Sequence, residues 1–208
     1  PGCLREGPMR TSDVDIMIVP GWSNSGPDHW QSRWQRNLKT ARRVEQTDWL
    51  APERDAWVAR VVEEVARATR PAVLVAHSLG VATVLHAAPM LDLRRLAGAF
   101  MIAPSDLDAR ASWPRDEGQD WEAIAGSFAP MPTARLPFPA RVIASSDDAF
   151  CSIERAQALG AMWGADVSIL AKAGHINTAS GHGPWPEGLL SFGLFLRSLD
   201  GPVAGSSH

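Results

Sequence analysis

Short apolar runs alternate along this chain with segments in which apolar residues recur at helical spacing. The continuous runs predict strands that are buried on both faces, at residues 16–19, 72–76, 97–102, 140–144 and 167–170. The helical spacing predicts helices over residues 28–38, 52–69, 80–88, 152–163 and 189–199. The second helix is the clearest, because Val58, Val61 and Val65 share one face. The third is apolar nearly all round, which predicts a buried helix.

This alternation predicts an α/β fold, with a mostly parallel sheet that helices cover on both faces. The pattern fits a single domain over residues 13–200, with a flexible polar tail at 201–208. The N-terminal segment at 1–12 is left outside the domain, and it lacks the apolar core of a secretory signal. Residues 104–130 are irregular, and we expect a small excursion over an edge of the sheet. The basic run at 33–43 indicates the solvated face of the first helix and its exit.

Composition adds little to the fold but excludes several functions. With 20 basic and 23 acidic side chains, the formal net charge of −3 does not favour a nucleic-acid partner or an anionic membrane surface. No stretch approaches the ~18 apolar residues of a membrane span. Cys3 and Cys151 cannot form a disulfide framework, and no paired-cysteine or HExxH spacing predicts a metal. We therefore expect a cytoplasmic protein without cofactor or metal, in which Cys151 is a small buried side chain.

Candidate chemistry enters at residues 76–80, which read Ala-His-Ser-Leu-Gly between a predicted strand and the predicted buried helix. This context is typical of a nucleophile elbow, a strained turn that lifts a serine hydroxyl above the sheet. Such a turn needs small residues two positions either side of Ser78, and Ala76 and Gly80 supply them, although glycine is usual at the first. The backbone N–H of Leu79 would then face a developing oxyanion. The simpler alternative is that Ser78 only caps the helix.

A serine hydroxyl is a weak nucleophile at neutral pH, so it needs a base, and the base needs an orienting acid. In this architecture the chain order is serine, acid, histidine. His175 follows the last predicted strand and fits that order. Asp147 and Asp148 follow the strand at 140–144, and both are candidates for the acid, with helix capping as the alternative role. The other histidines precede Ser78, flank it, lie in the buried helix or fall in later loops: His29, His77, His86, His182 and His208.

Several short motifs together resemble the serine hydrolases grouped with retinoblastoma-binding protein 9, a small branch of the α/β-hydrolase superfamily. The motifs run in order from about residue 16 to residue 199. They are Val19-Pro20-Gly21-Trp22, Pro27-Asp28-His29-Trp30-Gln31 with Trp34, His77-Ser78-Leu79-Gly80, Ser145-Ser146-Asp147-Asp148-Ala149-Phe150-Cys151, Gly174-His175-Ile176-Asn177 and Ser180-Gly181-His182-Gly183-Pro184-Trp185-Pro186. Each motif alone is weak, but their order is specific.

The resemblance implies an α/β-hydrolase fold, a three-layer sandwich with a sheet of about six strands and little or no lid. It also implies a triad of Ser78, Asp148 and His175. Family members often read Asp-Asp-Pro-Phe in the acid loop, and the second aspartate is the catalytic one. Here Ala149 replaces the proline, which leaves Asp147 open as the acid.

Residues and resemblance together predict a serine hydrolase that cleaves small esters, in the manner of a carboxylesterase acting on a small-molecule acyl substrate. The resemblance implies that the backbone N–H of Trp22 joins that of Leu79 in the oxyanion hole. No Leu-x-Cys-x-Glu stretch is present, so contact with the retinoblastoma protein is not implied, and no other protein partner is predicted. Two alternatives stay open: a thioesterase or amidase with the same triad, and a catalytically weak binding module that keeps the fold.

The chain has nine tryptophans and no tyrosine, and this bias bears on the substrate. Several tryptophans fall in or near loops that should rim the carboxyl ends of the strands, where such sites lie. We expect an apolar acyl or alkyl pocket there, and its candidate residues are Trp30, Trp113, Trp121 and Trp185. The alternative for each tryptophan is packing in the core.

Overall fold

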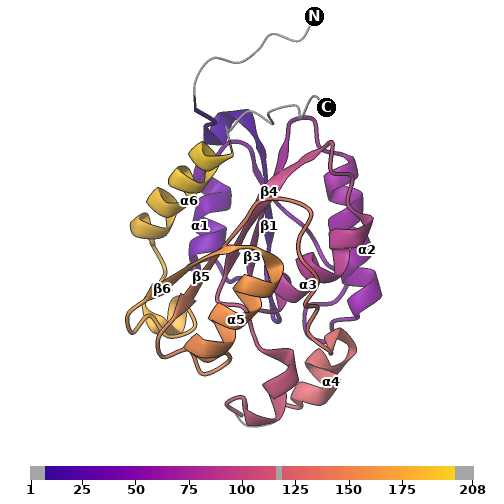
Figure 1. Cartoon of the computed structure of the whole chain (residues 1–208), viewed down its shortest axis with the longest axis vertical. Helices are drawn as coiled ribbons and strands as arrows, with labels where there is room; N and C mark the ends of the chain where they lie inside the picture. Colours follow the sequence, from indigo (N-terminus) through magenta and orange to yellow (C-terminus); the bar gives the residue numbers. More distant parts are fainter. Residues whose placement is uncertain (1–7, 116–118, 200–208) are drawn as a thin grey trace, which may run out of the picture.

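The computed structural model describes residues 8–115 and 119–199. Their central feature is a six-stranded parallel sheet in the order β2-β1-β3-β4-β5-β6 (Figure 1). The strands are β1 Asp15–Val19, β2 Ala41–Arg43, β3 Ala72–His77, β4 Leu96–Ile102, β5 Ala140–Ser145 and β6 Asp166–Leu170. The predicted tail at 201–208 and part of the predicted segment at 1–12 lie outside the described residues.

Helices cover both faces of the sheet, which gives three layers (Figure 1). The helices on one face are α2 Arg54–Ala66, α3 Leu79–Ala87 and α5 Ile153–Trp163, and those on the other are α1 Trp30–Asn37 and α6 Pro186–Ser198. Side chains alternate along each strand, so Met17 and Val19 enter one core while Ile16 and Ile18 enter the other. The fold class is therefore α/β, as predicted.

Every strand and helix predicted from the sequence is present, with ends that differ by three residues or fewer. The ends follow local chemistry. For example, the Ser152 side chain accepts a hydrogen bond from Arg155 N at the start of α5, and Gly164 ends that helix in the left-handed conformation. Within the part of the chain that the structure describes, no helix has the length and apolarity that a membrane crossing requires.

The irregular segment at 104–130 does not lie over an edge of the sheet, so that expectation is wrong. Its described residues fold into short helices, among them α4 Trp121–Ala125, beyond the carboxyl ends of the strands, at the bottom of Figure 1. The segment begins at the carboxyl end of β4, and its short helices lie between β4 and β5 in the chain. Asp106 anchors it there, because its backbone N–H donates to Phe150 O at 2.9 Å.

Strand β2 was missed, because its arginines belong to the basic run at 33–43. Arg42 contacts Glu64 at 3.0 Å and Asp15 at 3.5 Å. The half-buried Arg43 donates to Ser25 O at 3.1 Å and to Ser32 Oγ at 2.7 Å. The end of the basic run is therefore an edge strand with its own partners, and only the earlier part fits the predicted solvated face.

Candidate active site

Ser78 stands on a sharp turn between β3 and α3, as the sequence predicted. Its backbone has φ 56° and ψ −126°, a region that residues other than glycine rarely adopt. The turn closes because its neighbours are small. A Cβ on Gly80 would overlap the carbonyl oxygen of Val19 and lie 2.6 Å from that of Pro20. A Cβ on Gly21 would lie 2.8 Å from Ser78 Cβ, so the loop after β1 presses directly on the turn.

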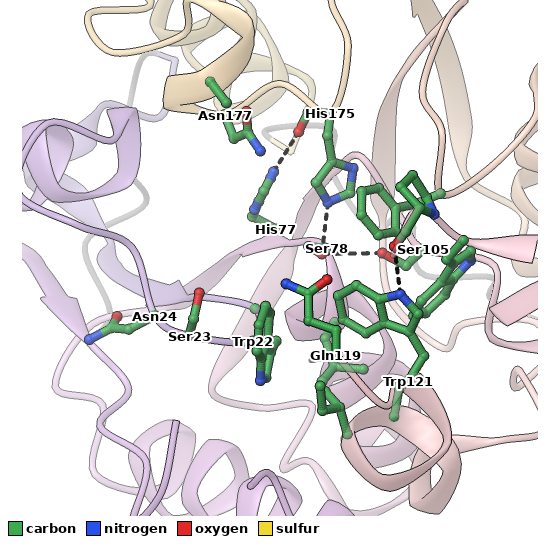
Figure 2. A pocket seen from close by; sticks show the side chains of 18 of the residues that line it. Trp22, Ser23, Asn24, His77, Ser78, Ser105, Gln119, Trp121, His175 and Asn177 are labelled. Atoms are coloured by element: carbon green, nitrogen blue, oxygen red, sulfur yellow. Dashed lines mark hydrogen bonds between the residues drawn. The ribbon is translucent and has the colours of Figure 1, made fainter. Parts of the chain in front are cut away.

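The structure brings Ser78, His175 and Asp148 into one hydrogen-bonded line, and Figure 2 shows the contact between His175 and Ser78. His175 Nε2 lies 2.8 Å from Ser78 Oγ, and His175 Nδ1 lies 2.9 Å and 3.0 Å from the two carboxylate oxygens of Asp148. The Asp148 side chain is only 2% exposed. Because a carboxylate accepts hydrogen bonds, it holds the proton on Nδ1 and leaves Nε2 free to accept the serine hydroxyl.

The two neighbouring aspartates differ in their contacts. Asp147 turns away from the imidazole, and its Oδ1 accepts from Ser145 Oγ and from Gly174 N, each at 2.8 Å. The Ser145 hydroxyl and the Gly174 N–H hold the pKa of Asp147 below its usual value. Asp147 therefore braces the loop that carries His175, and Asp148 is the aspartate that contacts the ring.

Ser105 was not identified from the sequence, yet its Oγ lies 3.1 Å from Ser78 Oγ (Figure 2). Ser105 is buried and follows β4, the strand next to β3 in the sheet. Its only sequence signal was this place at the carboxyl end of a strand, where parallel neighbours bring their loops together.

The predicted oxyanion donors lie beside the elbow. Neither the backbone N–H of Trp22 nor that of Leu79 donates a hydrogen bond to another described residue. A Cβ on Gly21 would lie 3.1 Å from Leu79 N, so the peptide that precedes Trp22 packs against the first amide of α3. Both residues also line the cavity above Ser78. The two amides are therefore adjacent, next to the serine and without a partner in the described part of the chain.

A cavity of about 330 Å³ opens over Ser78 and His175. Aromatic rings form one wall: Trp22, Trp113, Trp121 and Phe150. The ring centroid of Trp121 lies 5.2 Å from that of Trp22 and 5.4 Å from that of Trp113. The ring centroids of Phe150 and His175 lie 4.4 Å apart. We call these four rings the aromatic wall. The predicted pocket residues Trp113 and Trp121 therefore do line the cavity.

Polar residues line the other side of the cavity, and Figure 2 shows Asn177, Ser23 and Asn24 across Ser78 from Trp121. His29 and Thr178 also line the cavity; the His29 ring lies 5.0 Å from that of His77, and Thr178 follows Asn177 in the chain. The reactive serine therefore lies between this group of polar residues and the aromatic rings, and the polar Gln119 and Ser105 lie on the side of the rings.

Trp30 and Trp185 were predicted as pocket residues, and this prediction is wrong. Both are buried in the core between the sheet and helices α1 and α6, and neither lines the cavity. Their rings lie 5.3 Å apart and pack with Trp34, because the apolar side of α1 turns inward. Trp30 still supports the site indirectly, since its Nε1 donates to Ile176 O at 2.9 Å in the His175 loop.

Cys151 lies buried beside the acid loop, as expected from the sequence. Burial, together with the charges of Asp106 and Asp148, raises the pKa of its thiol to about 12. The thiol is therefore protonated at neutral pH and gives no nucleophile.

The fold and the strained serine elbow define a class, the α/β hydrolases. A family model described as serine hydrolase matches residues 16–193, so this chain belongs to the serine hydrolase family. A comparison with curated proteins finds no match.

Solved structures of bacterial proteins share the fold. A YdeN-like hydrolase of Pectobacterium atrosepticum is 28% identical, with 91% of this chain and 94% of that chain covered and a TM-score of 0.77. The ydeN gene product of B. subtilis is 18% identical over 86% and 97% of the two chains, with a TM-score of 0.68. A hydrolase of the α/β superfamily from Xanthomonas campestris is 17% identical over 88% and 96%, with a TM-score of 0.59. The fold is therefore the three-layer α/β-hydrolase fold, as predicted.

Proposed function

We propose that this serine hydrolase cleaves small carboxylic esters, with Ser78 as nucleophile, His175 as general base and Asp148 as the acid that orients it. The observation that carries the proposal is the line of contacts from Asp148 through His175 to Ser78, at 2.9 Å and 2.8 Å. Hydrogen-bonded contacts of this length are what proton transfer from a serine hydroxyl requires.

In the first half of the reaction, Ser78 Oγ attacks the ester carbonyl carbon while its proton passes to His175 Nε2. The carbonyl oxygen becomes an oxyanion, which the backbone N–H groups of Trp22 and Leu79 stabilise; one such donor is worth roughly 10²–10³-fold in rate. The C–O bond to the alcohol then breaks, and His175 returns the proton to the departing oxygen. An acyl group is left on Ser78.

In the second half, water gives a proton to His175 Nε2 and attacks the acyl carbon. The same amides hold the oxyanion, and the acid leaves as Ser78 regains its proton. Throughout, Asp148 stays ionised, keeps the proton of His175 on Nδ1 and stabilises the imidazolium.

The substrate places an apolar acyl or alkyl group against the aromatic wall. Ring faces and edges offer a large apolar contact area at little cost in conformational entropy. The cavity of about 330 Å³ is at the small end of the range for ligand pockets, which suits a small ester.

We also place this chain, within its family, beside the hydrolases grouped with retinoblastoma-binding protein 9. The shared segments support this placement because they surround the site. The Gln31 amide, for example, is fully buried and donates to Val19 O at 3.3 Å and Val75 O at 3.1 Å below the elbow. A family tree in which this chain branches away from that group would contradict the placement.

The experiment compares p-nitrophenyl esters of acetate, butyrate and octanoate with a thioester and an anilide of the same acyl groups. Wild-type protein and the Ser78→Ala variant are assayed side by side. We expect ester turnover that disappears in the variant, with the ester faster than the thioester and the anilide. Absence of Ser78-dependent turnover would instead favour a binding module, and a faster thioester or anilide would change the substrate class.

A further inference from the structure

The described residues that line the cavity include no Asp, Glu, Lys or Arg. Among the described residues, the two carboxylates of the acid loop are directed away from the cavity, Asp148 onto His175 and Asp147 onto Ser145 and Gly174. A positive charge on the substrate would therefore meet no counter-charge from these described residues, and an unpaired charge is costly to desolvate.

His29 supplies a hydrogen-bond donor on the polar side of the cavity. It is buried, with 6% of its surface exposed, and its Nδ1 accepts the N–H of Gln31 at 3.1 Å at the start of α1. Burial, together with the charge of Arg43, lowers the pKa of His29 to about 4. The ring is therefore neutral at neutral pH and carries its proton on Nε2, which contacts no acceptor among the described residues.

Asn177, two residues after His175, also has a side chain whose acceptor atom is used by a backbone N–H and whose donor group is not. Its Oδ1 accepts the N–H of Ser180 at 3.1 Å, so its acceptor atom is already used. The Nδ2 group donates to no described residue, and Figure 2 shows it directed toward the side of the site on which His77 lies. In both side chains the acceptor serves the backbone and the donor is left over.

We infer that the substrate is an uncharged ester whose arm away from the aromatic wall carries a hydrogen-bond acceptor, such as an ether or carbonyl oxygen, bound by His29 and Asn177. This inference rests on the proposed ester hydrolysis at Ser78 and adds the chemistry of the second arm. One arm of the ester packs on the aromatic wall, and the other places an oxygen among neutral donors. Aminoacyl and choline-type esters are poor substrates for the same reason.

The test uses pairs of esters of equal shape. The first pair is 2-methoxyethyl and butyl phenylacetate, which differ only in an oxygen for a methylene. The second pair is choline and 3,3-dimethylbutyl phenylacetate, which differ in a positive charge. Benzyl 3-methoxypropanoate and benzyl pentanoate repeat the first pair with the aromatic group on the alcohol side, because either arm of an ester can lie on the aromatic wall.

We expect kcat/KM for the methoxy ester to exceed that of its alkyl partner by about 3–10-fold in at least one orientation, the effect of one net hydrogen bond. We expect the choline ester to be at least ~10-fold slower than its neutral partner. Equal rates within the methoxy pairs, or a choline ester as fast as its neutral partner, would overturn the inference.

Variants assign the effect to its residues. His29→Asn keeps an oxygen to cap α1, while its shorter side chain draws the remaining N–H group back from the cavity, so the ratio of kcat/KM for the methoxy ester to that for its alkyl partner should fall toward one. Asn177→Asp keeps the bond to Ser180 and adds a negative charge, so the ratio of kcat/KM for the choline ester to that for its neutral partner should rise. His86→Asn is the matched control, since His86 does not line the cavity and its Nε2 contacts Phe128 O, and it should leave both ratios unchanged. Unchanged ratios in both site variants would contradict the assignment.

Failure of this inference differs from failure of the proposed function. If butyl phenylacetate is hydrolysed in a Ser78-dependent way but the paired esters do not differ, only the second-arm chemistry is wrong. If no ester is hydrolysed and Ser78 does not react with an acyl-type probe, the proposed function is wrong and the inference falls with it. A His29→Asn variant that does not fold leaves the Asn177→Asp comparison as the deciding measurement.

Discussion

The side chain of the buried His77 contacts the backbone of His175, with His77 Nε2 2.9 Å from the His175 carbonyl oxygen (Figure 2). Burial, reinforced by the neighbouring His175 and His29, holds the pKa of His77 well below its usual value, so the ring is neutral. A carbonyl can only accept, so His77 donates from Nε2. His175 is therefore held twice, at its ring by Asp148 and at its backbone by His77.

Replacing His77 tests whether this second anchor matters. His77→Phe keeps an aromatic ring in the buried position but removes the donor, and we expect kcat for an ester to fall by about 2–10-fold with little change in KM. His86→Phe is the matched control, because His86 Nε2 contacts Phe128 O at 2.7 Å away from the cavity. Steady-state kinetics checks both variants, and an equal loss of kcat in the two would argue against a positioning role.

The two aspartates of the acid loop should differ sharply. Asp148→Asn removes the carboxylate that fixes the tautomer of His175, and kcat should fall by roughly 10³–10⁴-fold. Asp147→Asn loses only its charge in contacts with Ser145 and Gly174, so kcat should stay within about 10-fold of wild type. Stopped assays with one p-nitrophenyl ester compare them directly. A larger loss for Asp147→Asn would exchange their roles.

The parts of the site that could be predicted from the sequence are those with a local pattern. The elbow lies between a continuous apolar strand and an apolar helix, and the partners of Ser78 follow later strands in a fixed chain order. Parallel strands bring such loops to one edge, so the sequence alone places His175 beside Ser78. Asp148 was singled out only by resemblance, because helix capping and neighbouring positions give Asp147 the same local signal.

The parts that could not be predicted depend on long-range packing. All four predicted pocket tryptophans fall in or near loops at the carboxyl ends of the strands, but Trp30 and Trp185 pack in the core against the sheet. The edge strand Ala41–Arg43 is short and basic, and only its partners Glu64 and Asp15 show why it pairs. Likewise Ser105 reaches Ser78 only because β4 lies beside β3 in the sheet.

A glycine pair tests the tight packing of the elbow. In Gly80→Ala the new Cβ would overlap Val19 O and crowd Pro20 O, so we expect a loss of roughly 1–3 kcal/mol in the free energy of unfolding. Gly193 also lies in a helix, but nothing lies within 4 Å of a Cβ there, so Gly193→Ala should stabilise by ~0.5–1 kcal/mol. Urea denaturation measures both, and a harmless Gly80→Ala would refute the packing described for the elbow.

The neutral His29 predicts a loss of stability in acid. Its pKa is lowered by burial to about 4 from an ordinary value of 6.5. Between these values the unfolded chain binds a proton that the folded chain does not, so the free energy of unfolding falls on acidification, by ~2–3 kcal/mol for this group at pH about 4.5. His29→Asn removes that contribution. Urea denaturation at pH about 7.5 and 4.5 should show a smaller drop for the variant than for wild type, and equal drops would contradict the prediction.

The most direct test of the proposed catalytic role of Ser78 is labelling with a fluorophosphonate, followed by mass spectrometry of the labelled peptide. An activated serine attacks the phosphorus, fluoride leaves, and the phosphonyl group stays on the oxygen. We predict one phosphonyl group on Ser78 at neutral pH, and none on the folded Ser78→Ala variant. A folded wild-type protein that carries no adduct, or carries it on Ser105 with Ser78 untouched, would contradict the account.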